Sequence, residues 1–280
     1  MFRSNFSIVS YLAWLRNPSL KSCYTELKES EFYDRASLLK IQEEKCRRLL
    51  RNARDNTSYY SDRLAHIDIE GDDIMGALSN VAVTTKSDLV RHSNKIQIKV
   101  GGRVFVSSTS GTSGEKLKFK KSELWDSYNR ASIARGYSWY GVNLDDYRLY
   151  FWGHSYSKIK LLTTRIQDYL FNRVRLFSLD PKDFGKVCRR SNHIVIIEGY
   201  SSVIYQFSQY CLKHDIQFPK LKLVKGTSEM IQESYKDSVF EAFGLPFVSE
   251  YGSAESGIIA FQCKNGTHHI NMENVIVEES

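Results

Sequence analysis

The stretch SSTSGTSGEKLKF, residues Ser107–Phe119, follows the short apolar run Val104–Val106. Its small residues allow the backbone to approach a ligand closely, and successive exposed N–H groups can form an anion-binding concavity. Its hydroxyl side chains add hydrogen-bond donors. Positive charge comes from four lysines at its end, Lys116, Lys118, Lys120 and Lys121. The pattern predicts a phosphate-binding loop that is delivered by a strand.

Two other interpretations of this stretch need to be considered. The first, a Walker A loop, is excluded because no Gly-Lys-Ser/Thr follows at the required spacing. A flexible Ser/Gly linker is the alternative. We favour the phosphate loop, because the stretch lies between a strand and an amphipathic segment, Leu124–Trp139.

A second segment far along the chain carries a tyrosine, a glycine and an acid, Tyr251-Gly252-Ser253-Ala254-Glu255. The run TSGTSG, Thr109–Gly114, resembles the phosphate loop of adenylate-forming enzymes, the acyl-CoA synthetase superfamily. Tyr251–Glu255 resembles the Tyr-Gly-x-Thr-Glu segment of the same enzymes. Both segments occur in the right order and far apart, which strengthens the resemblance to this superfamily. Within it, the chain most resembles the phenylacetate-CoA ligase group and the related CapK-type proteins of capsular polysaccharide synthesis.

This resemblance implies a two-step reaction. Such enzymes join a carboxylic acid to ATP, which gives an acyl-adenylate and pyrophosphate, and then pass the acyl group to the thiol of coenzyme A. We therefore expect ATP, Mg²⁺ and coenzyme A as cofactors or co-substrates. A non-catalytic accessory protein of polysaccharide assembly and a transferase with another phosphorylated donor remain the alternatives.

The resemblance also implies roles for individual residues. Thr112 or Ser113 would donate to phosphate, and Glu255 would hold Mg²⁺, which prefers one or two carboxylates plus phosphate oxygens. Many relatives carry Pro-Lys at the positions of Lys116 and Leu117, so Lys116 would supply its charge from a shifted position. The expected catalytic residues are thus Thr112, Lys116 and Glu255, and the expected phosphate cradle is Ser108, Thr109, Ser110, Gly111, Thr112, Ser113 and Gly114.

The nucleotide base would lie against Tyr251, with Gly252 and Ser253 beside it. Gly226, Thr227 and Ser228 resemble the loop that runs along the adenine ring. Two structural alternatives stay open: Ser228 as a simple helix N-cap, and Tyr251 as an aromatic residue of the core.

A further set of residues follows the predicted strand Arg148–Trp152. Open α/β sheets place ligands at the carboxyl ends of their parallel strands. Trp152, His154 and Tyr200 are therefore candidates for a pocket with aromatic walls that would take the acid.

The fold class predicted is α/β, a mainly parallel sheet with covering helices and short antiparallel strands. Strands and helices alternate between residues 145 and 250. We expect a helical part over residues 1–100 and an α/β nucleotide-binding part over 101–280. Finer expectations are a helix over 35–55, a helix N-cap at Thr85 or Ser87, a hairpin of Lys95–Val100 with Arg103–Val106, and a pair Ile258–Cys263 and His269–Glu278 that turns at Asn265-Gly266.

The bulk composition excludes several protein classes. The 280 residues carry a net charge of +7 that is spread along the chain, whereas a nucleic-acid protein concentrates its charge on one face. No apolar run reaches membrane-spanning length. Five scattered cysteines indicate reduced thiols and a cytoplasmic protein. We expect Tyr11, Trp14 and Leu15 to dock an N-terminal helix on the body, and leave open whether the protein is a homodimer.

Two features of the resembling enzymes would fall after Ser280. One is the ribose-binding aspartate together with a hinge and a mobile C-terminal domain that carries a lysine. Because that domain is absent from this chain, we expect the chain alone to bind nucleotide weakly and to adenylate poorly or not at all. The other is a zinc site. Cys263 and His269 match two of its ligands, but two are too few for a closed tetrahedral site, so a free thiol and a strand histidine are favoured.

Overall fold

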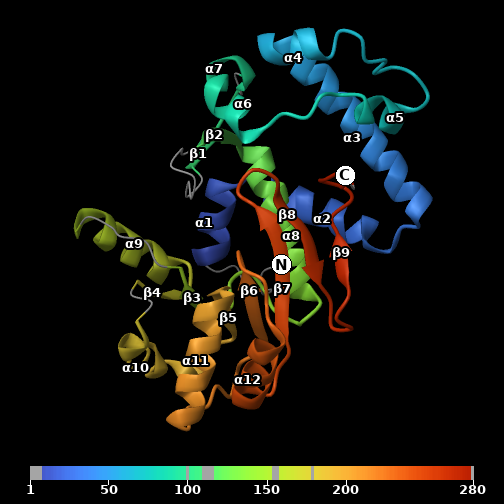
Figure 1. Cartoon of the computed structure of the whole chain (residues 1–280). Coiled ribbons are helices and arrows are strands. Elements are labelled where there is room, and N and C mark those ends of the chain that lie inside the picture. Colours follow the sequence, from blue (N-terminus) through green and yellow to red (C-terminus); the bar gives the residue numbers. More distant parts are fainter. Residues whose placement is uncertain (1–7, 99–100, 109–116, 153–157, 178–179, 279–280) are drawn as a thin grey trace.

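The computed structural model describes residues 8–98, 101–108, 117–152, 158–177 and 180–278. Within them, a sheet of seven strands runs in the order β4-β3-β5-β6-β7-β8-β9 (Figure 1). The first five of these are parallel, and β7, β8 and β9 are antiparallel. The strands are β3 (Arg148–Phe151), β4 (Arg173–Leu176), β5 (Ile196–Tyr200), β6 (Leu223–Thr227), β7 (Phe247–Ser253), β8 (Gly257–Gln262) and β9 (His268–Ile270). The predicted fold class is confirmed.

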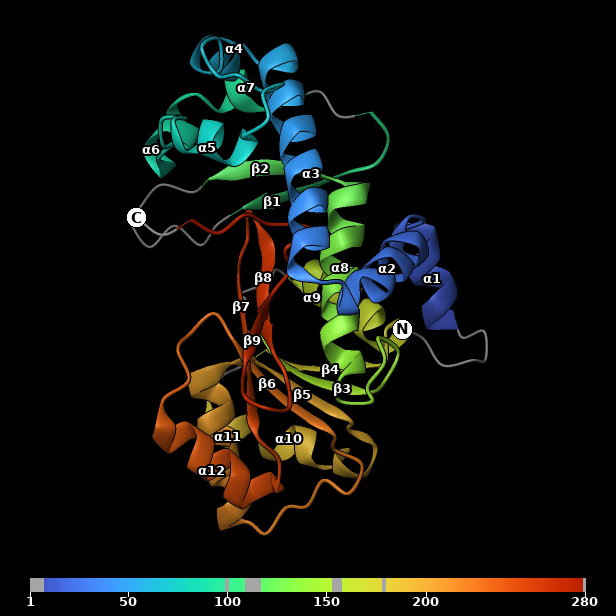
Figure 2. The same ribbon diagram turned by 90° about the vertical axis from the view of Figure 1, so that its right-hand side faces the viewer.

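Helices cover both faces of the parallel part, which explains its continuous apolar strands. On one face, Ile197, Val224 and Phe247 belong to a core that is closed by α11 (Ser201–Lys213) and α12 (Glu233–Phe243). On the other face, Ile196 and Leu223 pack beneath α8 (Glu123–Ser138). Figure 2 shows α8 on the opposite side of the sheet from α11 and α12.

The first hundred residues contribute helices among the positions described. The predicted helix over 35–55 is confirmed as α3, and Asp34 caps it by accepting from the backbone N–H of Ser37. Thr85 caps α6 in a capping box with Asp88, so Thr85 and not Ser87 has the predicted role. The helices are α1 (Ile8–Arg16), α2 (Leu20–Glu29), α3 (Arg35–Asn56), α4 (Ser58–Arg63), α5 (Ile74–Ser79), α6 (Lys86–Arg91) and α7 (Ser93–Ile96).

A buried ion pair ties these helices to the end of the chain. The guanidinium of Arg135 in α8 donates to Glu273 Oε1 at 2.6 Å and to the carbonyl of Leu27 in α2 at 3.2 Å. The side chains of Arg135 and Glu273 are 7% and 3% exposed. Gln42 of α3 donates to the carbonyl of Val275 at 2.7 Å. These contacts fix α2, α3, α8 and the C-terminal segment together.

The predicted N-terminal hairpin is wrong. Residues 93–96 form α7, which continues directly from α6 because the carbonyl of His92 accepts from the backbone N–H groups of Lys95 and Ile96. Instead, β1 (Val104–Ser108) pairs antiparallel with β2 (Lys118–Ser122), with Ser108 opposite Lys118. The segment between β1 and β2 is the predicted phosphate loop, so the loop is the connection of a hairpin.

Three smaller expectations need correction or confirmation. The turn at Asn265-Gly266 is confirmed, with Gly266 at φ +83°, but β9 ends at Ile270 because Asn271 starts a turn that accepts from Asn274. Tyr11, Trp14 and Leu15, which were expected to dock α1, are 44%, 55% and 43% exposed, and Ala13 of the same helix packs against the core cluster of α2. The sequence alone did not indicate α9 (Lys158–Leu170). A short helix, α10 (Gly185–Cys188), precedes β5.

Candidate functional site

The carboxyl edge of the parallel strands gathers several of the predicted site residues. Tyr200 ends β5 and Thr227 ends β6, and the two are directly paired in the sheet. Trp152 immediately follows β3, and Tyr251 lies in β7. Because parallel strands present their carboxyl ends at one edge, these residues from four strands share the edge where such sheets bind ligands.

An aromatic stack forms one side of this edge. The rings of Trp152 and Tyr200 lie 4.7 Å apart and are nearly parallel, with an interplanar angle of 10°. Tyr150 of β3 also stacks on Trp152, with ring centroids 6.0 Å apart. Trp152 and Tyr200 are half-buried, and burial raises the pKa of the Tyr200 hydroxyl. His154, the third predicted pocket residue, lies outside the described residues.

Directly beneath the edge, on the face that α8 covers, lies a set of buried charges that we call the charged layer, namely Arg148, Glu198, Lys225 and Glu250. The ammonium of Lys225 is 2.6 Å from Glu250 Oε2 and 3.2 Å from Glu198 Oε2. Arg148 Nη1 lies 3.3 Å from Glu198 Oε1, and the hydroxyl of Tyr137 in α8 donates to Glu198. Four neighbouring strands are thus joined by alternating charges.

The electrostatics of the charged layer keep it ionised. Burial alone would raise the pKa of Glu198, but Lys225 and Arg148 outweigh it and lower this pKa to about 2. Burial likewise opposes the charge of Lys225, yet Glu250 and the other neighbours hold its pKa well above the usual value. Glu198 and Lys225 precede Tyr200 and Thr227 by two positions, on the same face of the sheet. The site edge therefore rests on a floor of fixed charges.

The hairpin β1–β2 and the turn that carries Glu255 meet at the start of α8. Lys121 of β2 lies over the ring of Trp125, 4.2 Å from its centroid. Burial lowers the pKa of Lys121, and the negative charges of Asp126 and Glu255 oppose this shift. Figures 1 and 2 both show the hairpin beside the ends of β7 and β8.

The turn after β7 packs closely on α8 at Gly257 and is hydrogen-bonded to the side-chain amide of Asn129. Gly257 has φ +76°, and a Cβ there would lie 2.5 Å from Asn129 Oδ1. That oxygen accepts from the backbone N–H of Ile258 at 3.0 Å. Gly252 is also required, because its Cβ would lie 2.4 Å from the carbonyl oxygen of Gly257. Both glycines thus let two chain segments approach closely.

Glu255 projects from this turn into solvent. Its backbone N–H donates to Ser253 Oγ at 3.2 Å, and that of Ser256 donates to the same oxygen at 3.0 Å. Within the described residues, no group of three or more His, Cys, Asp or Glu side chains could hold a metal ion. A lone exposed carboxylate fits a Mg²⁺ ion that takes its other ligands from phosphate and water.

Tyr251 is 63% exposed, so its interpretation as a core aromatic is wrong. An exposed aromatic face at a strand edge can carry a base by stacking.

The loop after β6 combines packing and strain. Gly226 is buried, and a Cβ there would lie 2.5 Å from Ser201 Oγ, so packing alone requires this glycine. Ser228 adopts φ +67°, an unusual conformation for a residue other than glycine. The alternative of Ser228 as an N-cap is wrong, because α12 begins at Glu233 after Gln232. Such outliers cluster at ligand sites.

The phosphate loop itself is only partly placed. Ser108 ends β1 and is exposed, and the chain resumes at the buried Leu117 before β2. The expected cradle and catalytic residues between them, including Thr112, Ser113 and Lys116, lie outside the described residues.

Cys263 and His269 were expected to be a free thiol and a strand histidine. Among the described residues, no group of three or more His, Cys, Asp or Glu side chains could hold a metal ion. His269 contacts Trp139 edge to face, with ring centroids 5.4 Å apart. Cys263 is half-buried and free. The described cysteines form no disulfide among themselves, and no helix in the described ranges is long and apolar enough to cross a membrane.

Sequence reasoning missed the charged layer. The signal was present, since Glu198 and Lys225 interrupt the apolar runs HIVIIEGY and LKLVKGT. A charge within a strand that is buried on both faces needs a partner. Two such charges of opposite sign in consecutive strands would have indicated a buried pair.

Comparisons with known proteins agree with this geometry at the level of fold. No family model and no curated protein matches the sequence. Among solved structures, 2-hydroxyisobutyryl-CoA ligase in complex with 2-HIB-AMP and CoA in the thioesterification state matches with a TM-score of 0.65 and 13% identity, over 86% of this chain and 55% of that chain. An open conformation of the same ligase matches with a TM-score of 0.58 and 12% identity, over 80% of this chain and 52% of that one. This chain thus spans about half the length of these proteins. It has the fold of the N-terminal domain of an adenylate-forming enzyme.

Proposed function

We propose that the protein takes part in the ATP-dependent activation of a carboxylic acid as an acyl-adenylate, followed by transfer of the acyl group to coenzyme A. The observation that carries this proposal is the meeting of two distant segments at one end of α8. Lys121, next to the predicted phosphate loop, lies within the electrostatic reach of Glu255. A phosphate cradle and a metal-binding carboxylate must be neighbours to hold one nucleotide triphosphate.

The residues at the site would divide the work as follows. The hydroxyl and backbone donors of Ser108–Gly114 would bind the phosphates, and Lys116 with Lys121 would offset their charge. Tyr251 would stack on the adenine ring beside Thr227 and Ser228. When bound at Glu255, Mg²⁺ would neutralise charge on the phosphate oxygens. Trp152 and Tyr200 would orient the acid so that its carboxylate faces the α-phosphate.

The kind of acid is a finer proposal. Two stacked rings at the carboxyl edge suit a flat, apolar acid, because aromatic pairs favour offset stacking. An aryl acid, as in the phenylacetate-CoA ligase group, therefore fits Trp152 and Tyr200 best. A hydroxy acid belongs in the same test, since 2-hydroxyisobutyryl-CoA ligase shares the fold.

The test is ATP–pyrophosphate exchange with a panel of aryl and hydroxy acids. Exchange and nucleotide binding are both measured with the protein as its gene encodes it. Glu255→Gln should lower exchange by about 10²–10³-fold, the effect of losing one charge-stabilising group. Glu233→Gln, on the exposed start of α12, is the matched control and should leave exchange unchanged.

Binding by this chain is followed at the loop. Addition of Mg·ATP should move the amide signals of Ser108–Gly114. If these signals stay in place, the phosphate cradle is refuted. If nucleotide binds without exchange, an accessory role in polysaccharide assembly replaces the ligase proposal.

A further inference from the structure

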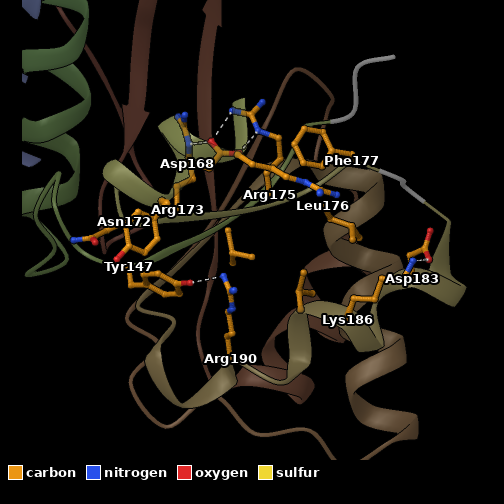
Figure 3. Close-up of a pocket in the computed structure, with 14 residues that line it drawn as sticks. Tyr147, Asp168, Asn172, Arg173, Arg175, Leu176, Phe177, Asp183, Lys186 and Arg190 are labelled. Atoms are coloured by element: carbon orange, nitrogen blue, oxygen red, sulfur yellow. Dashed lines mark hydrogen bonds and ion pairs between the residues drawn. The ribbon is translucent and has the colours of Figure 1, made fainter. Parts of the chain in front are cut away.

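A cavity of about 620 Å³ lies along β4, the edge strand of the sheet (Figure 3). None of the candidate site residues described above lines it. Its size falls within the range of small-molecule pockets in proteins. It is therefore a second place on this chain where a ligand could be enclosed.

The lining of this cavity is strongly basic. Five of its side chains are cationic and two are anionic: Arg165, Arg173, Arg175, Lys186 and Arg190 against Asp168 and Asp183. Both acids already form ion pairs, Asp168 with two arginines and Asp183 with Lys186. The unbalanced charge is positive, which favours an anionic occupant.

Two arginines of the lining share one carboxylate. Arg173 Nε lies 2.5 Å from Asp168 Oδ1, and Arg175 Nε lies 3.1 Å from Asp168 Oδ2. The side chains of Arg175 and Asp168 are only 8% and 6% exposed. One carboxylate balances only one of these two positive charges, so Arg175 and Arg173, the latter 25% exposed, leave a net positive charge at the cavity wall. An anion in the cavity would compensate it.

Other cations face this pair from the opposite wall. Figure 3 shows Arg190 and Lys186 across the cavity from Arg173 and Arg175. Arg190 is held there by its Nη1, which donates to the hydroxyl of Tyr147 at 2.9 Å. Arg165 joins the lining from α9. Guanidinium groups on two sides can bind a tetrahedral anion with several forked hydrogen bonds.

We propose that this cavity binds the phosphoryl group of a small molecule. The excess of three cations suits an anion of charge two or more, and arginine is the residue whose planar fork matches phosphate oxygens. The rings of Tyr147, Tyr169 and Phe177 also line the cavity and provide an apolar wall for the rest of the molecule.

The cavity is connected to the carboxyl edge by aromatic contacts. The guanidinium of Arg175 lies over the ring of Tyr150, 4.7 Å from its centroid. Tyr150 stacks on Trp152, which stacks on Tyr200. An anion that neutralises Arg175 weakens the cation–π contact with Tyr150. The fluorescence difference between the wild type and Trp152→Phe isolates Trp152 among four tryptophans and gives a second, optical readout of occupancy.

The experiment titrates pyrophosphate into the chain labelled with ¹⁵N-arginine. The Nε–Hε signals of Arg173 and Arg175, each assigned by its own lysine variant, report on side chains that line this cavity, and the double variant below separates binding here from binding at the phosphate loop. We expect saturable shifts of these signals. The double variant Arg165→Ala/Arg190→Ala should weaken binding by about 100-fold, roughly tenfold for each guanidinium that no longer donates to the anion.

Arg189→Ala is the matched control, because Arg189 is exposed, adjacent in sequence and outside the lining. It should keep wild-type affinity. Both removed arginines are exposed, so the melting temperature of the double variant should match the wild type and exclude misfolding. Shifts that never saturate, or a double variant with unchanged affinity, would overturn the proposal. So would a glutamate-rich peptide that saturates the signals where pyrophosphate does not, since that outcome identifies a protein-docking edge.

Discussion

The ammonium of Lys225 lies between two carboxylates, 2.6 Å from Glu250 and 3.2 Å from Glu198, and none of the three side chains is more than 8% exposed. Lys225 therefore partners carboxylates from the neighbouring strands on either side of β6, and Arg148 supplies the second positive charge at Glu198. Since the layer sits directly under the carboxyl edge, its loss would affect both stability and the site.

Replacing this central cation should be severe. Lys225→Met keeps the length of the side chain but leaves Glu198 and Glu250 buried without their shared partner. We expect a loss of about 3–5 kcal/mol in the free energy of unfolding, the usual cost of breaking a buried pair. Urea denaturation measures it. Lys222→Met, on the exposed approach to the same strand, is the control and should change stability by less than about 0.5 kcal/mol.

Acid should unfold the protein partly through Glu198. Its pKa in the folded chain is about 2, below the usual value of 4.5. The stabilisation from this depressed pKa is fully present above pH 4.5 and is lost as the pH falls toward 2. In Glu198→Gln, the slope of unfolding free energy against pH in this window should be smaller by up to about 1.4 kcal/mol per pH unit. An unchanged slope would mean that Glu198 is not ionised in the fold.

Substituting two glycines with similar φ angles distinguishes the cost of backbone strain from the cost of a steric clash. Gly141 has φ +67° with open space around it, whereas Gly257 has φ +76° and faces Asn129. Gly141→Ala should cost about 1–2 kcal/mol from backbone strain alone. Gly257→Ala should cost about 1–3 kcal/mol more, the range for overpacking. Equal losses in the two variants, measured by urea denaturation, would contradict the close packing of the Glu255 turn on α8.

Tyr251 offers a test of the base platform that spares the fold. Its side chain is 63% exposed, so Tyr251→Ala should leave the melting temperature nearly unchanged. Loss of stacking should weaken ATP binding by about tenfold, whereas Tyr251→Phe keeps the ring and should bind like the wild type. Calorimetric titration with Mg·ATP distinguishes these outcomes. Equal affinity in all three proteins would remove Tyr251 from the site.

The parallel sheet was predictable because its strands are apolar runs that end at turn residues. Ile194–Ile197 and Leu221–Lys225 are recognisable in this way, although each structural strand begins two residues later and extends beyond its charged residue. The extension has one cause in both cases. Glu198 and Gly226 resemble strand ends in sequence, but the pairing of Glu198 with Lys225 allows each strand to continue through its charge.

The errors arose where distant contacts decide. Residues 95–98 alternate polar and apolar like a strand, yet the capped helix α6 extends into α7 there. β2 was overlooked because Lys118, Lys120 and Lys121 are typical of a solvated loop. Phe119 and Leu117 alternate with these lysines, and the pairing of this segment with β1 is visible only in three dimensions. Tyr251 and Glu255 were identified by resemblance, and their exposure could not be derived from the sequence.

The charged layer also fixes the register between strands β5 and β6. If β6 slid by two residues against β5, Glu198 would face Leu223 or Thr227 instead of Lys225, and the apolar alternation would not register the slip. The alternating charges penalise that slip where hydrophobic matching cannot. The strands beneath the carboxyl edge therefore resist sliding past one another, which keeps the platform of the site in register.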